Sequence, residues 1–236
     1  MKTSPTPKPS LVLLCGLLSD ERVWQHIADS LHDIATVSIL NFRGFDSITA
    51  MAEHLLATTT GTISVAGHSM GGRVALEAYR LAPGRFQKMA LLNSGMHPRQ
   101  EKETAGREQL LALAAEQGMG AVADTWLPPM MSPAGQQNET LMTNLKQMIC
   151  RYSVQDFQKQ ITALLNRPDA QPLLSQINIP TLLICGDADR WSPVAQHQEM
   201  VAYLPDSHLV TLANCGHMST VESPEEISQA FRNWLT

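Results

Sequence analysis

A serine at position 69 has the surroundings expected of an enzymatic nucleophile. It is the centre of a Gly-His-Ser-Met-Gly sequence (67–71), which follows a short β-branched run (62–66) and precedes a helical pattern that stops at Pro83. A strand, a Gly-x-Ser-x-Gly turn and a helix in this order favour a functional serine over an incidental one in a glycine-rich turn. So sharp a turn excludes side chains two residues from the serine, where Gly67 and Gly71 stand. We therefore expect the hydroxyl at the carboxyl end of the strand, near helix N–H groups that favour negative charge.

A serine hydroxyl is a poor nucleophile until a base takes its proton, and His217 is the best candidate for that base. It follows the last predicted strand, and Gly216 before it would let the loop bring the imidazole over the edge of the sheet. His68 adjoins the serine, but its side chain leaves the turn in another direction, so we expect it to pack. The remaining histidines are interpreted as pocket-lining (His97) or as surface and half-buried residues: His26, His32, His54, His197 and His208.

The base in turn needs an acid that fixes its tautomer and stabilises its cation. Two aspartates, Asp187 and Asp189, follow the fifth predicted strand. Spacing alone does not choose between them, and either could instead cap the turn or helix at Pro193. The fourth predicted strand ends in Asn-Ser-Gly (93–95) and offers no competing acid.

The elements that must position these side chains alternate between strands and helices. Apolar runs predict six strands, over residues 11–16, 35–42, 62–66, 88–93, 181–186 and 208–212. Amphipathic patterns predict a helix that ends near residue 31 and further helices over 47–57, 74–82, 194–203 and 224–234. This alternation predicts an α/β fold with a mostly parallel sheet of about six strands, covered by helices on both faces. Ligands of such sheets bind beyond the carboxyl ends of the strands.

The stretch between the fourth and fifth predicted strands is too long for a simple crossover. Its helical patterns, interrupted by proline and glycine, cover residues 108–116, 119–126, 141–149 and 157–165. We expect a core formed by residues 1–95 and 174–236 and an inserted helical cap formed by residues 96–173. Six of the twelve methionines fall in the cap, where most should pack its interior and one or two could face a ligand. The candidate substrate-binding residues are Met96, His97, Trp126, Met130, Trp191 and Met218.

The composition is that of an ordinary globular protein of 236 residues, 44% hydrophobic and 17% charged. A net charge of −5 disfavours a nucleic-acid partner or an anionic membrane surface, and no segment is long enough to span a membrane. The four cysteines lack Cys-x-x-Cys or zinc spacing and are interpreted as reduced thiols of a cytoplasmic protein. Residues 1–10 are interpreted as a disordered leader, because no cleavage site follows the apolar run after them. No metal, nucleotide or flavin site is visible, so we expect no cofactor, and nothing indicates an oligomeric state.

The order Ser69, Asp189, His217 over these strands resembles the α/β-hydrolase superfamily, and the resemblance covers nearly the whole chain. The matching stretches are Gly-His-Ser-Met-Gly-Gly (67–72), Gly-Asp-Ala-Asp (186–189) and Gly-His (216–217). The resemblance implies that the second aspartate, Asp189, is the acid of the triad. It favours a serine esterase with a helical cap.

A further match is Cys-Gly-Leu (15–17) with Trp24, where the family usually has His-Gly-x and a downstream tryptophan. The resemblance implies that the backbone N–H groups of Leu17 and Met70 form the oxyanion hole. Two departures are visible: Cys15 replaces the usual histidine, and the leading antiparallel strands of the family are missing. Six parallel strands should remain.

The expected function is hydrolysis of small carboxylic esters through an acyl-enzyme, that is, a carboxylesterase acting on a small-molecule substrate. The fold itself does not choose the substrate. Similar chains cleave enol-lactones or carbon–carbon bonds in aromatic degradation, or acyl-carrier methyl esters. A slow-turnover ligand receptor that keeps the triad is the non-enzyme alternative. Haloalkane dehalogenation is disfavoured, because that chemistry uses an aspartate where Ser69 stands.

Overall fold

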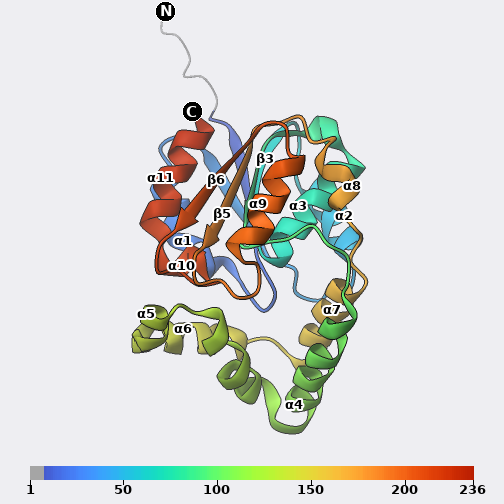
Figure 1. The fold of residues 1–236 in the computed structure, drawn as a ribbon, viewed down its shortest axis with the longest axis vertical. Helices are drawn as coiled ribbons and strands as arrows, with labels where there is room; N and C mark the ends of the chain where they lie inside the picture. The colour runs from blue at the N-terminus through green and yellow to red at the C-terminus, as the bar shows by residue number, and fades with distance from the viewer. Residues whose placement is uncertain (1–7) are drawn as a thin grey trace, which may run out of the picture.

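The computed structural model describes residues 8–236, and its sheet has six strands. Every neighbouring pair is parallel, and the strand order is β2-β1-β3-β4-β5-β6 (Figure 1). The strands are Ser10–Leu14 (β1), Thr36–Leu40 (β2), Ile63–His68 (β3), Phe86–Leu92 (β4), Thr181–Gly186 (β5) and Ser207–Leu212 (β6). The expected α/β fold with six parallel strands is confirmed, and each strand ends within two residues of its predicted bounds.

The leader predicted over residues 1–10 falls mostly outside the described residues, which begin at Lys8. Its last residue belongs to the sheet, because Ser10 pairs with Thr36 at the start of β1. The predicted boundary between leader and fold is therefore wrong by at least one residue. The first residue of β1 could not be recognised in the sequence, because Ser10 is polar and the apolar run begins only at Leu11.

Helices cover both faces of the sheet. On one face α1 (Gln25–Leu31) packs against α11 (Pro224–Leu235), and α2 (Ile48–Thr58), α3 (Met70–Leu81) and α9 (Val194–Tyr203) lie on the other (Figure 1). The short elements are η1 (Glu21–Val23), η2 (Pro83–Arg85) and α10 (Ser219–Glu222). Among the helices described in residues 8–236, none combines the length and the apolar character needed to cross a membrane.

The long connection between β4 and β5 is helical and lies beyond the carboxyl ends of the strands (Figure 1). We call residues 96–173 the insertion; its bounds as a separate cap stay a prediction. Its elements are α4 (Glu101–Trp126), η3 (Pro128–Met130), α5 (Pro133–Gln137), α6 (Glu139–Ile149) and α7 (Val154–Leu165), with α8 (Gln171–Leu174) at its carboxyl end. The helices predicted over 108–116 and 119–126 are two parts of α4, which is broken at Gly118, where φ is +79°.

The turn between β3 and α3 leaves no room for side chains beside Ser69. The backbone of Ser69 has φ +53° and ψ −114°, a conformation that residues other than glycine rarely adopt. A Cβ atom on Gly67 would lie 2.3 Å from the carbonyl carbon and oxygen of Gly71. A Cβ atom on Gly71 would lie 2.3 Å from the carbonyl oxygen of Leu14 in β1. The glycine pattern is therefore a packing requirement, because strand, turn and helix backbones are in contact here.

Gly67→Ala should destabilise the protein by about 3 kcal/mol or more, because backbone atoms rather than flexible side chains oppose the added methyl group. Gly84→Ala is the matched control, since no atom lies within 4 Å of its Cβ position, and its effect should stay within about 1 kcal/mol. Urea denaturation of both variants measures the difference. Equal stability of the two variants would contradict the packing account.

Candidate active site

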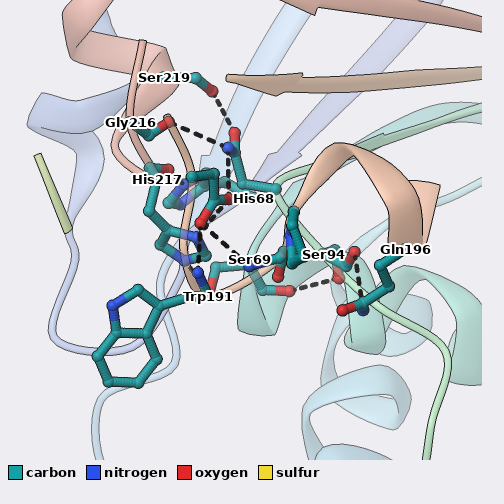
Figure 2. Close-up of polar contacts among 12 residues, drawn as sticks. His68, Ser69, Ser94, Trp191, Gln196, Gly216, His217 and Ser219 are labelled. Atoms are coloured by element: carbon teal, nitrogen blue, oxygen red, sulfur yellow. Dashed lines mark hydrogen bonds and ion pairs between the residues drawn. The ribbon is translucent and has the colours of Figure 1, made fainter. Parts of the chain in front are cut away.

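Ser69, His217 and Asp189 form a continuous chain of hydrogen bonds at the carboxyl edge of the sheet. The Nε2 atom of His217 lies 2.9 Å from the Ser69 hydroxyl oxygen, and its Nδ1 atom lies 2.8 Å from Oδ2 of Asp189 (Figure 2). A carboxylate can only accept, so Nδ1 carries the proton and Nε2 of the neutral ring is free to accept from the serine. The structure thus brings together the three side chains singled out from the sequence.

The Asp189 carboxylate is buried and accepts hydrogen bonds at both oxygens. Oδ1 accepts from the backbone N–H groups of Trp191 (2.8 Å) and Ser192 (3.0 Å), so the aspartate also caps its own turn. Burial alone would raise the pKa of Asp189, but the adjacent His217 and the hydrogen bonds from His217, Asn93 and Ser192 hold that pKa below its usual value. The carboxylate is therefore ionised at neutral pH.

Asp187, the other candidate acid, contacts the loop that carries His217 and not its imidazole. Its Oδ1 atom accepts the backbone N–H of Cys215 at 3.3 Å, on the loop that carries His217. Its side chain does not reach the imidazole, and the residue is exposed. Of the two aspartates, Asp189 contacts the imidazole of His217, and Asp187 contacts the backbone of the loop that carries it.

Asn93, at the end of β4, is a site residue that the sequence analysis missed. It is fully buried, and its Nδ2 atom donates to Oδ2 of Asp189 (2.9 Å) and to the carbonyl of Gly216 (3.2 Å). Its Oδ1 atom accepts from the hydroxyl of Ser219 (Figure 2). One amide therefore links the acid to the loop of the base. The available signal was a polar residue directly after an apolar strand, but in the sequence that position shows only that no acid stands there.

The loop that carries His217 is held against the insertion. The His217 N–H donates to the carbonyl of Met130 at 2.7 Å. A Cβ atom on Gly216 would lie 2.5 Å from the nitrogen of Ser132 and 2.6 Å from the oxygen of Met130, so only glycine fits there. Glu222 bridges the two segments, accepting from the N–H groups of Gly216 (3.1 Å) and Ser132 (2.8 Å). Close packing against the insertion is therefore what requires glycine at position 216.

The two backbone N–H groups expected to form an oxyanion hole, those of Leu17 and Met70, border the same cavity as Ser69. Within residues 8–236, neither donates a hydrogen bond to another protein group. Leu18, with φ +53°, follows in the loop, and its N–H donates to Oε1 of Gln160 at 2.9 Å. These two N–H groups therefore have no partner among the described residues, in the cavity that Ser69 also lines.

Side chains of the insertion support this loop. Gln160 is fully buried and donates from Nε2 to the carbonyl of Phe42 (3.0 Å), while the Tyr152 hydroxyl donates to the carbonyl of Ser19 (2.6 Å). Cys15 is fully buried, and burial raises the pKa of its thiol far above neutrality. Cys15 therefore remains a neutral thiol, and the polar support for the loop comes from α7 and the turn before it.

A cavity of about 600 Å³ opens at Ser69 and His217, between the sheet edge and the insertion. Five of the six predicted substrate-binding residues line it: His97, Trp126, Met130, Trp191 and Met218. Met96 does not, and that prediction is wrong. Its side chain is fully buried in the hydrophobic core, so proximity to His97 in sequence does not bring it to the cavity.

Two further histidines are buried. His197 was expected at the surface or half-buried, but it is fully buried, and its Nε2 atom accepts the N–H of Ser94 at 3.3 Å. His68 donates from Nε2 to the carbonyl of His217 at 2.8 Å, and its Nδ1 has no partner in the described part of the chain. Burial, followed by the nearby charge of His217, lowers the pKa of His68 to about 4. His68 is thus neutral at pH 7, and its hydrogen bond supports the backbone at His217.

Because the pKa of His68 is lower in the folded protein than its usual value near 6.5, protonation favours the unfolded chain. Its contribution to stability is complete above pH 6.5 and is lost as the pH falls towards 4, by roughly 3 kcal/mol in all. His68→Gln keeps an amide donor near the Nε2 position, and should lose less stability between pH 7 and pH 4.5 than the wild type. The exposed His208→Gln is the control, and urea denaturation at several pH values is the measurement. Parallel profiles for wild type and His68→Gln would contradict this prediction.

The sequence of residues 11–230 matches the family described as the alpha/beta hydrolase family. The pimeloyl-[acyl-carrier protein] methyl ester esterase of Nitrosomonas europaea is 26% identical to this chain, over 94% of each protein. Among solved structures, a thermophilic esterase from Thermogutta terrifontis with bound malate superposes with a TM-score of 0.87 at 25% identity, covering 97% of this chain and 90% of that one. The enol-lactonase from Burkholderia xenovorans LB400 superposes with a TM-score of 0.89 over 98% and 92% of the two chains; at 20% identity this likeness concerns the fold.

The family match begins at the second residue of β1 and ends within α11, so it takes in all six strands but for Ser10 and both loops that carry Asp189 and His217. The resemblance stated from the Gly-x-Ser-x-Gly turn and the chain order of Ser69, Asp189 and His217 is confirmed by this match. The chain belongs to the α/β hydrolase family.

Proposed function

We propose that this α/β hydrolase cleaves carboxylic esters of small molecules, with Ser69 as nucleophile, His217 as general base and Asp189 as the orienting acid. The observation that carries the proposal is the unbroken chain of hydrogen bonds from Asp189 through His217 to Ser69, which ends at a cavity. A serine whose hydroxyl faces an imidazole acceptor is poised to attack a carbonyl.

In this mechanism His217 takes the proton from Ser69 as the serine oxygen attacks the ester carbonyl. The imidazolium then gives that proton to the departing alcohol, which leaves an acyl group on Ser69. Water, deprotonated by His217, attacks the acyl-enzyme and releases the carboxylic acid. Asp189 stabilises the imidazolium in both halves of the cycle, and its low pKa keeps the carboxylate charged throughout.

The negative charge that develops on the carbonyl oxygen needs donors, and we assign this role to the N–H groups of Leu17 and Met70. Both border the cavity beside Ser69, and Met70 is the first residue of α3, whose N-terminus favours negative charge. One such donor typically lowers the barrier by ~3 kcal/mol. Gln160 and Tyr152 contribute by holding the loop that presents Leu17.

An apolar part of the cavity wall favours a modest hydrocarbon group on the substrate. Trp126, Met130, Trp191 and Met218 contribute it, from the insertion and from the loops that follow β5 and β6. The hydrocarbon group of a small ester would contact these residues, which is consistent with a carboxylesterase. Absence of a cofactor, a cytoplasmic location and the lack of a nucleic-acid partner stay predictions from the sequence.

Ser69→Ala should lower the turnover of a p-nitrophenyl ester by a factor on the order of 10⁶, because no other group can form the acyl-enzyme. Ser175→Ala, at an exposed serine, is the control and should keep wild-type activity. Near-normal hydrolysis by Ser69→Ala would refute the assignment.

An ester panel with acetyl to octanoyl groups separates the esterase from its rivals. A carbon–carbon hydrolase would be nearly inactive on the whole panel. A slow-turnover receptor would instead react stoichiometrically with a fluorophosphonate at Ser69 and release almost no product. The esterase proposal requires both steady turnover on the panel and labelling that disappears in Ser69→Ala.

A further inference from the structure

One part of the cavity wall carries an excess of positive charge. Among the described residues that line it, four are arginines and Glu103 is the one carboxylate. Arg73 comes from α3, Arg107 from α4, and Arg167 from the segment that follows α7. Arg190, the fourth, is exposed in the loop after β5. Arg107 and Arg167 flank Glu103, and the first three arginines with the one carboxylate give this part of the wall a net charge of +2.

Arg167 is fully occupied by protein groups. It donates to both oxygens of Glu103, at 2.7 and 2.8 Å, and to the carbonyls of His97 (3.1 Å), Pro98 (2.9 Å) and Leu164 (2.8 Å). A guanidinium has five N–H donors, and these five bonds use them all. Arg167 therefore links segments of the insertion through their carbonyl groups and also pairs with the carboxylate of Glu103.

Arg73, in contrast, has few hydrogen-bond partners and no counter-ion among the described residues. Its one hydrogen bond to a described residue runs from Nη1 to the carbonyl of His97 at 2.8 Å, and no described carboxylate lies within 4.0 Å of it. Burial, followed by the charge of Arg167, lowers the pKa of Arg73 to about 9, which still leaves it protonated at neutral pH. A half-buried cation with free donors and no counter-ion is costly unless a ligand supplies the negative charge.

The guanidinium of Arg107 likewise makes no hydrogen bond to a described carboxylate. Its nearest carboxylate oxygen, Oε2 of Glu103, lies at 3.7 Å, too far for a hydrogen bond, and that oxygen already accepts from Arg167. The side chain of Arg107 is only 18% exposed. Two guanidiniums, those of Arg73 and Arg107, thus line the cavity with donors that no described residue uses.

The position of Arg73 relative to Ser69 limits how far the anionic group of a ligand can lie from its ester carbonyl. Arg73 follows Ser69 by four residues on α3, so its Cα atom lies about one helical turn, roughly 6 Å, further along the helix. An anion bound there and a carbonyl at Ser69 would occupy one cavity, separated by a short chain. Arginine suits a planar carboxylate because two parallel N–H groups match its two oxygens.

Resting on the proposed esterase function, we propose that Arg73 and Arg107 form an anion-binding subsite and that the substrates are esters carrying a free carboxylate a few carbon atoms from the ester group. The apolar wall would then contact the hydrocarbon portion of the substrate, and the arginines its charged end. Arg73 and Arg107 are specificity-determining residues in this proposal and take no part in proton transfer.

Two esters of one length test the subsite: mono-4-nitrophenyl glutarate, with a free carboxylate, and its methyl ester, in which that carboxylate is capped. The wild type should prefer the acid by at least tenfold in kcat/KM. Arg73→Gln and, separately, Arg107→Gln should lower this preference at least tenfold, mainly through KM for the acid, and Arg73→Lys should restore part of it. Arg99→Gln, which removes an exposed arginine outside the cavity, is the control and should keep the preference.

A wild type that cleaves both esters with equal kcat/KM would overturn the subsite and leave the esterase function standing. If neither ester is cleaved, the esterase function fails, and binding decides the subsite on its own. Glutarate, titrated into the Ser69→Ala protein by calorimetry, should bind and should lose at least tenfold in affinity when Arg73→Gln or Arg107→Gln is added. Dimethyl glutarate is the uncharged reference. Equal binding of glutarate with and without the arginine substitutions would overturn the proposal.

Discussion

The site depends on a single buried charge, the carboxylate of Asp189. Removing a carboxylate from water is costly, and the cost is offset here because both oxygens accept two hydrogen bonds each. The donors are the backbone N–H groups of Trp191 and Ser192, the amide of Asn93 and the ring of His217. The fold fixes three of these four donors, so the remaining lone pair of the Asp189 carboxylate is available to the imidazole of His217. This hydrogen bond orients the ring and keeps the proton on its Nδ1 atom.

The insertion does more than cover the cavity. It supplies the carbonyl of Met130 to the loop of the base, and Gln160 and Tyr152 to the loop of Leu17. Both catalytic loops of the proposed mechanism are therefore completed by residues that lie between β4 and β5 in the sequence. The same segment provides Arg107 and the Arg167–Glu103 pair, so the insertion contributes part of the charge of the cavity, while Arg73 and Arg190 come from the core. The insertion thus shares in positioning both loops and in lining the cavity.

The sequence was sufficient for the features that depend on local pattern. Apolar runs located the strands within two residues, and the glycines around Ser69 identified a turn without room for side chains. Proximity of Ser69, Asp189 and His217 followed from placing all three after parallel strands, whose carboxyl ends share one edge. Choosing Asp189 over Asp187 required the family pattern, because spacing carries no information about which aspartate turns inward.

The features that sequence reasoning missed depend on docking between distant segments. Gln160 reaches the N–H of Leu18 across 142 positions, and nothing in the local pattern of α7 distinguishes it from the exposed Gln158. Met96 was misassigned because neighbours in sequence can face opposite sides, one towards the core and one towards the cavity. The state of Arg73 is equally invisible in sequence: among the described lining residues the one carboxylate, Glu103, pairs with Arg167 instead.

The central claim, that buried Asp189 makes Ser69 nucleophilic by orienting His217, is tested most directly by the rate at which a fluorophosphonate labels Ser69. In Asp189→Asn the amide would favour the wrong tautomer of His217, and the second-order labelling rate should fall by a factor on the order of 10³ to 10⁴. Intact mass spectrometry over time gives this rate, and a cooperative melting transition would verify that the variant is folded. A folded Asp189→Asn protein that is labelled as fast as the wild type would contradict the account.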